Sequence, residues 1–246
     1  MTGWDVLIYA ALPYAAIAAF LVGHFWRYRR DQYNWTSRSS QLLESRLLRA
    51  GSITFHYGTF AAIGGHVLGL LIPASWTAAA GISEDAYHLI SAIGGIVAGL
   101  AVIFGFTVLV YRRATVARVR TNTSRMDVAV MALLALGIAT GMAVTVLANI
   151  GAHIDYRATV APWFRGLLVL DPDPALMSGV HWVLQVHVTL VWLLYGLWPF
   201  SRLVHAWSVP VDWFIRSPVL FRGRPGRPRT VAGRRAVDRP LTRSES

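Results

Sequence analysis

The chain has 246 residues and a formal net charge of +11, and 55% of its residues are hydrophobic. Only 14% are charged, whereas soluble globular chains carry roughly 25%, so the composition favours an integral membrane protein. The chain has no cysteine, which excludes disulfides, cysteine-ligated zinc and iron–sulfur clusters within it. Nucleic-acid binding is not expected, because a basic total in a membrane protein reflects topology and contact with anionic lipid.

Five apolar segments are long enough to cross the hydrocarbon core of a bilayer, which takes about 20 residues. In chain order they are Val6–Trp26, Ile53–Ile72, Tyr87–Tyr111, Val128–Ala148 and Val180–Phe200. Each is expected to be helical, because lipid offers the backbone no hydrogen-bond partner. Pro13 is expected to kink the first helix, and Pro199 to bend or end the fifth. The first segment lacks a basic stretch before it and is too long for a signal peptide, so we expect it to be retained.

The basic residues predict how these helices are oriented, and all 23 of them are arginine. Six lie between the first and second segments, five between the third and fourth, and ten after the fifth. None lies between the second and third segments, and two lie between the fourth and fifth. The positive-inside rule therefore predicts an N-terminus outside and a cytoplasmic C-terminus.

The predicted fold is all-α, an integral membrane bundle of five transmembrane helices over residues 1–221. As a multi-pass protein it is expected in the inner (cytoplasmic) membrane of the cell. Residues 222–246 are rich in arginine, proline and glycine and have too little apolar surface to fold. We expect this stretch to be a basic, disordered cytoplasmic tail.

Four of the eight histidines are candidate functional residues, because an imidazole in hydrocarbon is costly without a partner. In the second segment, His56 lies near the cytoplasmic face and His66 lies about 15 Å further out, at 1.5 Å per residue. The fifth segment runs the other way, so His187 lies in its outer half and His205 follows its inner end. Matching these depths pairs His66 with His187 and His56 with His205.

Two bis-histidine sites, one above the other, are consistent with two haem b groups, since haem takes axial ligands from the protein without needing cysteine. Glycines beside the second-segment histidines would leave room for a flat group. These glycines are Gly58, Gly64, Gly65 and Gly69. On the cytoplasmic side, Arg112 and Arg113 could meet haem propionates, or could simply hold the topology.

The spacing of the histidines leaves an alternative open. A straight helix from His187 to His205 would span about 27 Å, against about 15 Å between His56 and His66. Tilt and a break at Pro199 would have to absorb the difference. On spacing alone, buried histidines that hydrogen-bond between helices are an equally good interpretation.

Two long runs of residues point to a known family. They are QYNWTSRSSQLLESRLLRAGSITFHYGTFAAIGGHVLGLLIP at 32–73 and PFSRLVHAWSVPVDWF at 199–214, with a weaker third run, RVRTNTSRMD, at 118–127. These runs resemble the gamma subunit of respiratory nitrate reductase, the membrane cytochrome b of that complex. The resemblance covers about residues 4 to 220, in register and without large gaps.

The resemblance implies two b haems, ligated by His56 and His205 near the cytoplasm and by His66 and His187 near the outside. It also implies that quinol, menaquinol or ubiquinol, is oxidised beside the outer haem and that its protons are released outside. The electrons would pass inward through the haems to an iron–sulfur subunit, and then to a molybdenum catalytic subunit that reduces nitrate to nitrite.

The sequence departs from the family at the expected quinol site. Some members carry a lysine between the second and third spans, whereas this chain has Ala86 there and no lysine. Tyr87 or His88 could donate the hydrogen bond instead, with quinol lying against Gly65 and Gly69.

Two other functions compete with this prediction. The same dihaem bundle could serve a sulfite- or heterodisulfide-reducing complex, and neighbouring genes for a molybdenum subunit would favour nitrate. A haem-free transporter or scaffold belongs to a different class and would show no Soret band. The lack of an internal repeat and of acidic residues inside the spans argues against transport.

Overall fold

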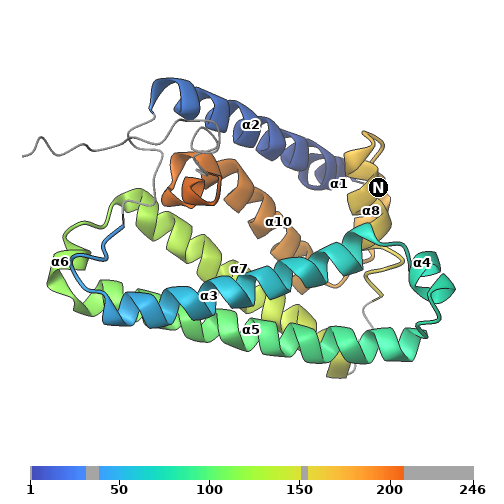
Figure 1. Cartoon of the computed structure of the whole chain (residues 1–246). Coiled ribbons are helices and arrows are strands. Elements are labelled where there is room, and N and C mark those ends of the chain that lie inside the picture. The colour runs from blue at the N-terminus through green and yellow to red at the C-terminus, as the bar shows by residue number, and fades with distance from the viewer. Residues whose placement is uncertain (1, 32–38, 151–154, 208–246) are drawn as a thin grey trace, which may run out of the picture. The chain divides into compact units, whose positions relative to one another are not determined.

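The described part of the chain is helical throughout. The computed structural model describes residues 2–31, 39–150 and 155–207, and no strand occurs in these ranges (Figure 1). The chain divides into two units, Met1–Val209 and Pro210–Ser246. The second unit, and with it the predicted tail 222–246, lies outside the described residues.

Long helices occupy each of the five predicted apolar segments. The first segment contains α1 (Gly3–Val6), the π-helical η1 (Leu7–Ala11) and α2 (Leu12–Arg30), and the second contains α3 (Arg46–His66) and the π-helical η3 (Val67–Leu71). The third corresponds to α5 (Glu84–Thr115) and the fourth to α7 (Arg125–Ile150). The fifth contains α10 (Trp182–Leu197) and the 3₁₀ turn η4 (Trp198–Phe200), and the 3₁₀ turn η5 (Arg202–Ala206) follows it. Short helices lie in the connections: α4 (Ala74–Ala79), α6 (Ala117–Arg120), α8 (Val160–Leu168) and α9 (Ala175–Ser178).

Four helical segments of the described chain are long and apolar enough to cross a membrane. They are Gly3–Arg30, Glu84–Thr115, Arg125–Leu147 and Trp182–Phe200. Helix α3, with 21 residues, is long enough but is not among them, because its histidines, glycines and hydroxyl side chains make it less apolar. The multi-pass membrane character is therefore confirmed, whereas the fifth span and the orientation of the termini stay predictions.

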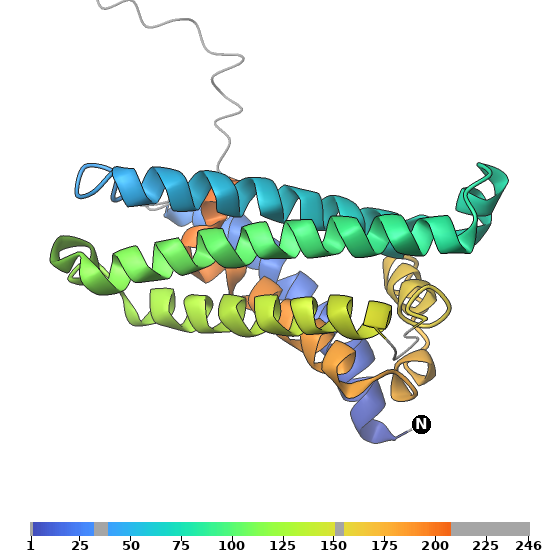
Figure 2. The same ribbon diagram turned by 90° about the horizontal axis from the view of Figure 1, so that it is seen from below.

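The long helices are packed as a series of neighbours in the order α3, α5, α7, α10 and α2. Figures 1 and 2 show α3, α5 and α7 running side by side, with α10 between α7 and α2. We call the end that carries α8 and α4 the α8 end, and the opposite end, with α6 and η5, the α6 end. Because α3 starts at the α6 end, His56 lies nearer that end and His66 nearer the α8 end.

Glycines allow α3 and α5 to approach closely. A Cβ added to Gly105 would collide with the backbone of Phe55 and lie 2.8 Å from the Gly51 carbonyl oxygen. A Cβ added to Gly58 would lie 2.9 Å from the Val102 amide nitrogen. Small residues at such a contact let helix backbones meet. Gly58 therefore serves the contact with α5, and the prediction that it makes room for a flat ligand is wrong.

This contact gives a first prediction. Gly105→Ala should lower the melting temperature of the purified protein in detergent, because the new methyl group meets backbone and overpacking costs about 1–3 kcal/mol. Gly94→Ala, on the same helix, is the matched control, since a Cβ there meets nothing within 4 Å. Equal melting temperatures for the two variants would contradict this account of the α3–α5 contact.

Pro13 was expected to kink the first helix, and in the structure it lies just after the π-helical turn η1. The Leu12 N–H donates to the Leu7 carbonyl, five residues back. Pro13 has no N–H to offer the carbonyl of Tyr9, four residues before it. The Trp163 indole N–H, from α8, donates to that carbonyl at 2.8 Å instead.

The second π-helical segment, η3, is also held by α8. Its Leu70 carbonyl accepts a hydrogen bond from Arg165 at 2.9 Å, where Pro73 prevents the helix from continuing. Trp163 and Leu167 of α8 are almost fully buried in the apolar core of this end. Helix α8, which the sequence did not predict, thus links η1, before α2, to η3, after α3.

Candidate functional site

The structure brings the four candidate histidines together as two pairs. The ring centres of His56, on α3, and His205, on η5, are 5.9 Å apart. The ring centres of His66, at the end of α3, and His187, on α10, are 6.3 Å apart. These are the same pairs that depth matching predicts.

A break after α10 resolves the mismatch in spacing. Helix α10 ends at Leu197, and Pro199 lies in the 3₁₀ turn η4 that follows. Ser201 is extended, with φ −114° and ψ −179°, so η5 starts in a new direction. His205 therefore reaches His56 without the length of a straight helix, and the predicted effect of Pro199 is confirmed.

The separation of the rings fits two imidazoles on opposite sides of one metal ion. Two metal–nitrogen bonds of about 2.0 Å, plus about 1.1 Å from each nitrogen to its ring centre, give about 6.2 Å. Two imidazoles joined by a direct N–H···N hydrogen bond would have centres about 5.2 Å apart. The observed separations are closer to the first value than to the second, so they do not fit a direct hydrogen bond between the two imidazoles of a pair.

Each of the four histidines has its Nδ1 against a backbone carbonyl oxygen. The contacts are His56 to Ser52 at 2.7 Å, His66 to Ala62 at 2.7 Å, His205 to Arg202 at 2.7 Å and His187 to Gly137 at 3.1 Å. A carbonyl oxygen can only accept, so Nδ1 carries the proton in each ring. The lone pair is then on Nε2, and metal-ligating histidines commonly donate their other N–H in this way.

The pairs suit a metal that brings its own equatorial ligands. Within the described residues, no group of three or more His, Cys, Asp or Glu side chains could hold a metal ion. A porphyrin-bound iron takes its protein ligands from side chains such as histidine, and the two imidazoles of each pair would serve this purpose. Beside the His66–His187 pair, a Cβ added at Gly64 or Gly65 would meet nothing within 4 Å, so this side of α3 has room for a flat group.

Arg112, the predicted propionate partner, has other contacts in the structure. It is 3% exposed, and it donates to the Glu44 carboxylate at 2.6 Å, to the Glu44 carbonyl at 2.7 Å and to both oxygens of Ser40. Burial of the Glu44 carboxyl raises its pKa, but hydrogen bonds from Leu47 and Arg112 outweigh this and leave the pKa below its ordinary value. These contacts favour a role in holding the segment before α3, and propionate binding stays a prediction.

Two of the four predicted quinol-site residues meet at the α8 end. A Cβ added at Gly69 would lie 3.0 Å from the ring of Tyr156 and 3.5 Å from the Tyr87 hydroxyl. The two phenol oxygens are 3.1 Å apart, and Ser91 Oγ lies 3.4 Å from that of Tyr156. Tyr156 was not predicted, because it lies in a connection where the sequence has no periodic pattern.

The other two predicted quinol-site residues are not part of this cluster. His88 is exposed on α5, and a Cβ at Gly65 would meet nothing within 4 Å. Arg157 instead completes the cluster, because its guanidinium lies 3.8 Å above the Tyr87 ring. It also pairs with Glu84 at 3.1 Å and donates to Thr77 at 2.8 Å.

Residues 5–224 match the model of the family described as nitrate reductase gamma subunit. The chain belongs to the nitrate reductase gamma subunit family. The family predicted from the sequence is therefore confirmed.

Named relatives support this assignment along most of the chain. The nitrate reductase gamma chain of Bacillus subtilis is 40% identical over 218 residues, which cover 89% of this chain and 98% of that protein. The respiratory nitrate reductase 1 gamma chain of Escherichia coli is 30% identical over 223 residues, with the same coverage. The nitrate reductase-like protein NarX of Mycobacterium tuberculosis is 43% identical over 220 residues, but this chain spans only 34% of its length.

Membership in this family fixes the broad class of the protein. The chain is a member of the nitrate reductase gamma subunit family whose described part has helices long and apolar enough to cross a membrane. A transporter or scaffold unrelated to nitrate reductase is disfavoured on the same ground.

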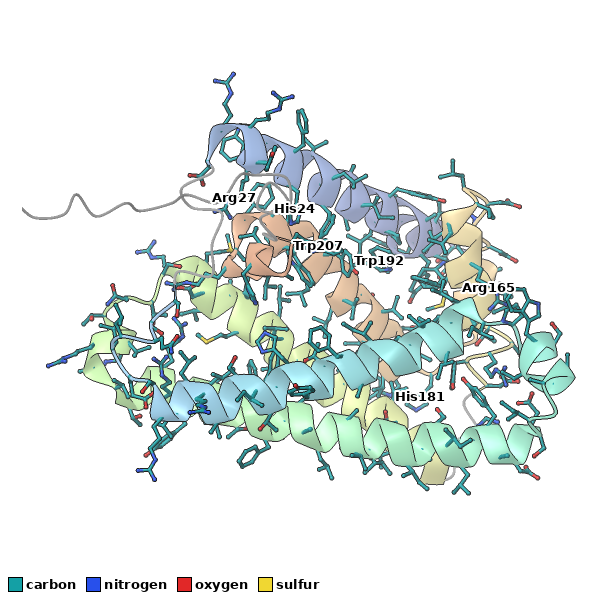
Figure 3. The ribbon with its side chains drawn as sticks, viewed as in Figure 1. His24, Arg27, Arg165, His181, Trp192 and Trp207 are labelled. Atoms are coloured by element: carbon teal, nitrogen blue, oxygen red, sulfur yellow. The ribbon has the colours of Figure 1, made fainter. Side chains whose placement is uncertain are left out.

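Of the remaining histidines of this gamma subunit, His181 and His24 have structural roles, and His88 is exposed. His181 Nδ1 accepts from the Val183 N–H at 3.3 Å and caps the start of α10, so its proton is not on Nδ1. His24 Nδ1 donates to the Phe20 carbonyl at 2.7 Å on α2, in the region where Figure 3 labels Arg27 and Trp207. His153 is outside the described ranges.

Proposed function

We propose that this gamma subunit holds two haem b groups and oxidises quinol for nitrate reduction by its partner subunits. One haem would be held by His56 and His205, and the other by His66 and His187. The observation that carries the proposal is the pair of imidazole separations, 5.9 and 6.3 Å, combined with Nδ1 protons that leave the Nε2 lone pairs for iron.

The histidines would bind haem through Nε2, and their backbone contacts would fix the ring orientations. When bound, haem supplies one-electron transfer. A carbonyl that accepts the Nδ1–H makes the opposite nitrogen more basic and keeps the ring from turning. Ser52, Ala62 and Gly137 provide such carbonyls from the interiors of α3 and α7, which are rigid supports.

Quinol would bind at the α8 end, next to the His66–His187 pair. Gly69 follows His66 by about 4.5 Å along the helix axis, at 1.5 Å per residue, and the phenols of Tyr87 and Tyr156 lie against it. A phenol can both donate and accept a hydrogen bond, so this pair would hold a quinol hydroxyl in place of the lysine that the resemblance implies for some members. Arg157 would hold the Tyr87 ring in place through its contact with the ring face.

The direction of electron flow follows from the predicted topology. With the α8 end outside, the protons of quinol would leave on that side and the electrons would be delivered at the α6 end, in the cytoplasm. The chain has no cysteine, so an iron–sulfur centre must be on a partner. The iron–sulfur and molybdenum subunits expected from the resemblance would fill these roles, in the inner membrane.

A visible spectrum of the purified protein tests the proposal. We expect a Soret band, two haem b per chain by the pyridine haemochrome assay, and reduction of both haems by a menaquinol analogue. Reoxidation by nitrate should require the partner subunits. A preparation that is folded, by its melting transition, but shows no haem would overturn the proposal.

A further inference from the structure

His205 is the one candidate ligand that does not lie in a long helix. It is on the 3₁₀ turn η5, after the break that follows α10. A short turn beyond a proline is a weak support, since its last carbonyls lack helical partners. Something outside α10 must therefore fix the position of His205.

Arg27 holds this segment from the side of α2. Its guanidinium donates to the Pro199 carbonyl at 2.7 Å and to the Ser201 carbonyl at 3.2 Å. Arg27 is 7% exposed, whereas Arg29 and Arg30, in the same helical turn, are exposed. Any of the three arginines would satisfy the positive-inside rule. Among the contacts of the described residues, only Arg27 of these three donates hydrogen bonds to the segment between α10 and η5.

Asp127 holds the segment from the side of α7. Its carboxylate, in a residue 8% exposed, accepts from Arg202 Nε at 2.7 Å, and a second Arg202 nitrogen donates to the Asn122 carbonyl at 2.8 Å. The carbonyl of Arg202 accepts the His205 Nδ1–H at 2.7 Å. The carboxylate thus fixes the side chain of Arg202, and the backbone of the same residue fixes the imidazole.

We propose that Arg27 and the Asp127–Arg202 ion pair form a clamp that positions His205 opposite His56. This inference rests on the proposed function, in which the His56–His205 pair holds a haem. The clamp residues are positioning residues, because they act on the ligand through backbone carbonyls. The charges of Arg27 and Asp127 are buried against these partners, so they set geometry in addition to topology.

The test uses the full chain in which the other haem is an internal reference. Arg27→Gln and Asp127→Asn should shift the electron paramagnetic resonance signal and the reduction potential of the His56–His205 haem. Its affinity should fall about 10- to 100-fold, the usual loss when a partner of a metal ligand is removed. The signal of the His66–His187 haem should stay unchanged, and a His56→Ala variant, which retains only that haem, assigns the two signals.

Two matched variants separate geometry from charge. Arg29→Gln removes an exposed arginine from the same turn and should leave both signals in place. Arg27→Lys keeps the charge but lacks the planar fork of arginine, so we expect an intermediate shift. Unchanged spectra in both Arg27→Gln and Asp127→Asn, or equal shifts of the two haems, would overturn the clamp. A wild-type chain without haem would instead overturn the proposed function.

Discussion

His66→Ala is expected to reduce the haem content from two per chain to one and to abolish quinol oxidation. The imidazole of His66 lies 6.3 Å from that of His187, centre to centre, and its Nδ1–H is fixed by the Ala62 carbonyl at 2.7 Å. A methyl group would leave His187 as the one imidazole of this pair, so the haem at this site should be lost. The pyridine haemochrome assay counts the haems, and reduction of the purified protein by a menaquinol analogue measures quinol oxidation.

His181→Ala is the control for that experiment. His181 is also an imidazole near the α8 end, but its Nδ1 accepts a hydrogen bond and caps α10. Loss of such a cap costs about 1 kcal/mol of stability, so His181→Ala should melt earlier and keep two haems. Two haems per chain in His66→Ala would contradict the assignment of the His66–His187 pair.

The length of the apolar segments and the distribution of arginine predicted the helices and the histidine pairs. Apolar length gave the position of each long helix, and the arginine distribution ordered His56, His66, His187 and His205 by depth. The depth of a residue in the membrane follows from its position along a helix, because each residue adds a fixed rise. The pairing therefore needed no knowledge of how the helices pack.

The contacts that hold the histidine pairs in place could not be predicted from the sequence. Counting arginines assigns Arg27, Arg112 and Arg157 to loops, yet all three are buried and bonded to specific oxygens. Which arginine meets which carbonyl depends on helix packing between segments far apart in the chain. Helix α8 was missed for a related reason. It is short, and its Trp163 and Arg165 side chains donate hydrogen bonds to two backbone carbonyls that lie shortly before Pro13 and Pro73.

The glycines show the same limit. Gly58, Gly64, Gly65 and Gly69 look alike in sequence, as small residues next to two histidines. In the structure Gly58 meets α5, Gly69 meets Tyr156, and Gly64 and Gly65 meet nothing within 4 Å. Only the three-dimensional surroundings distinguish a glycine that packs against another helix from a glycine that leaves space for a ligand.

Gly141→Ala is expected to weaken haem binding at the His66–His187 pair about 10- to 100-fold. A Cβ at Gly141, on α7, would lie 2.9 Å from His187 Cε1 and 3.4 Å from its Nδ1. The ring is the movable partner in this contact, so the imidazole should shift while α7 and α10 stay packed. Overpacking costs about 1–3 kcal/mol, and about 1.4 kcal/mol corresponds to a tenfold change in affinity.

Gly137→Ala separates this effect from a general effect of alanine on α7. Gly137 lies one turn before Gly141, its added Cβ would meet nothing within 4 Å, and its carbonyl still accepts the His187 Nδ1–H at 3.1 Å. Haem titration of the two variants should therefore show wild-type affinity for Gly137→Ala and a loss for Gly141→Ala only. Because the steric conflict falls on His187 alone, the His56–His205 haem should bind equally well in both variants. A loss at both sites would mean that the substitution disturbs the packing of α7, and that His187 is not the group that moves.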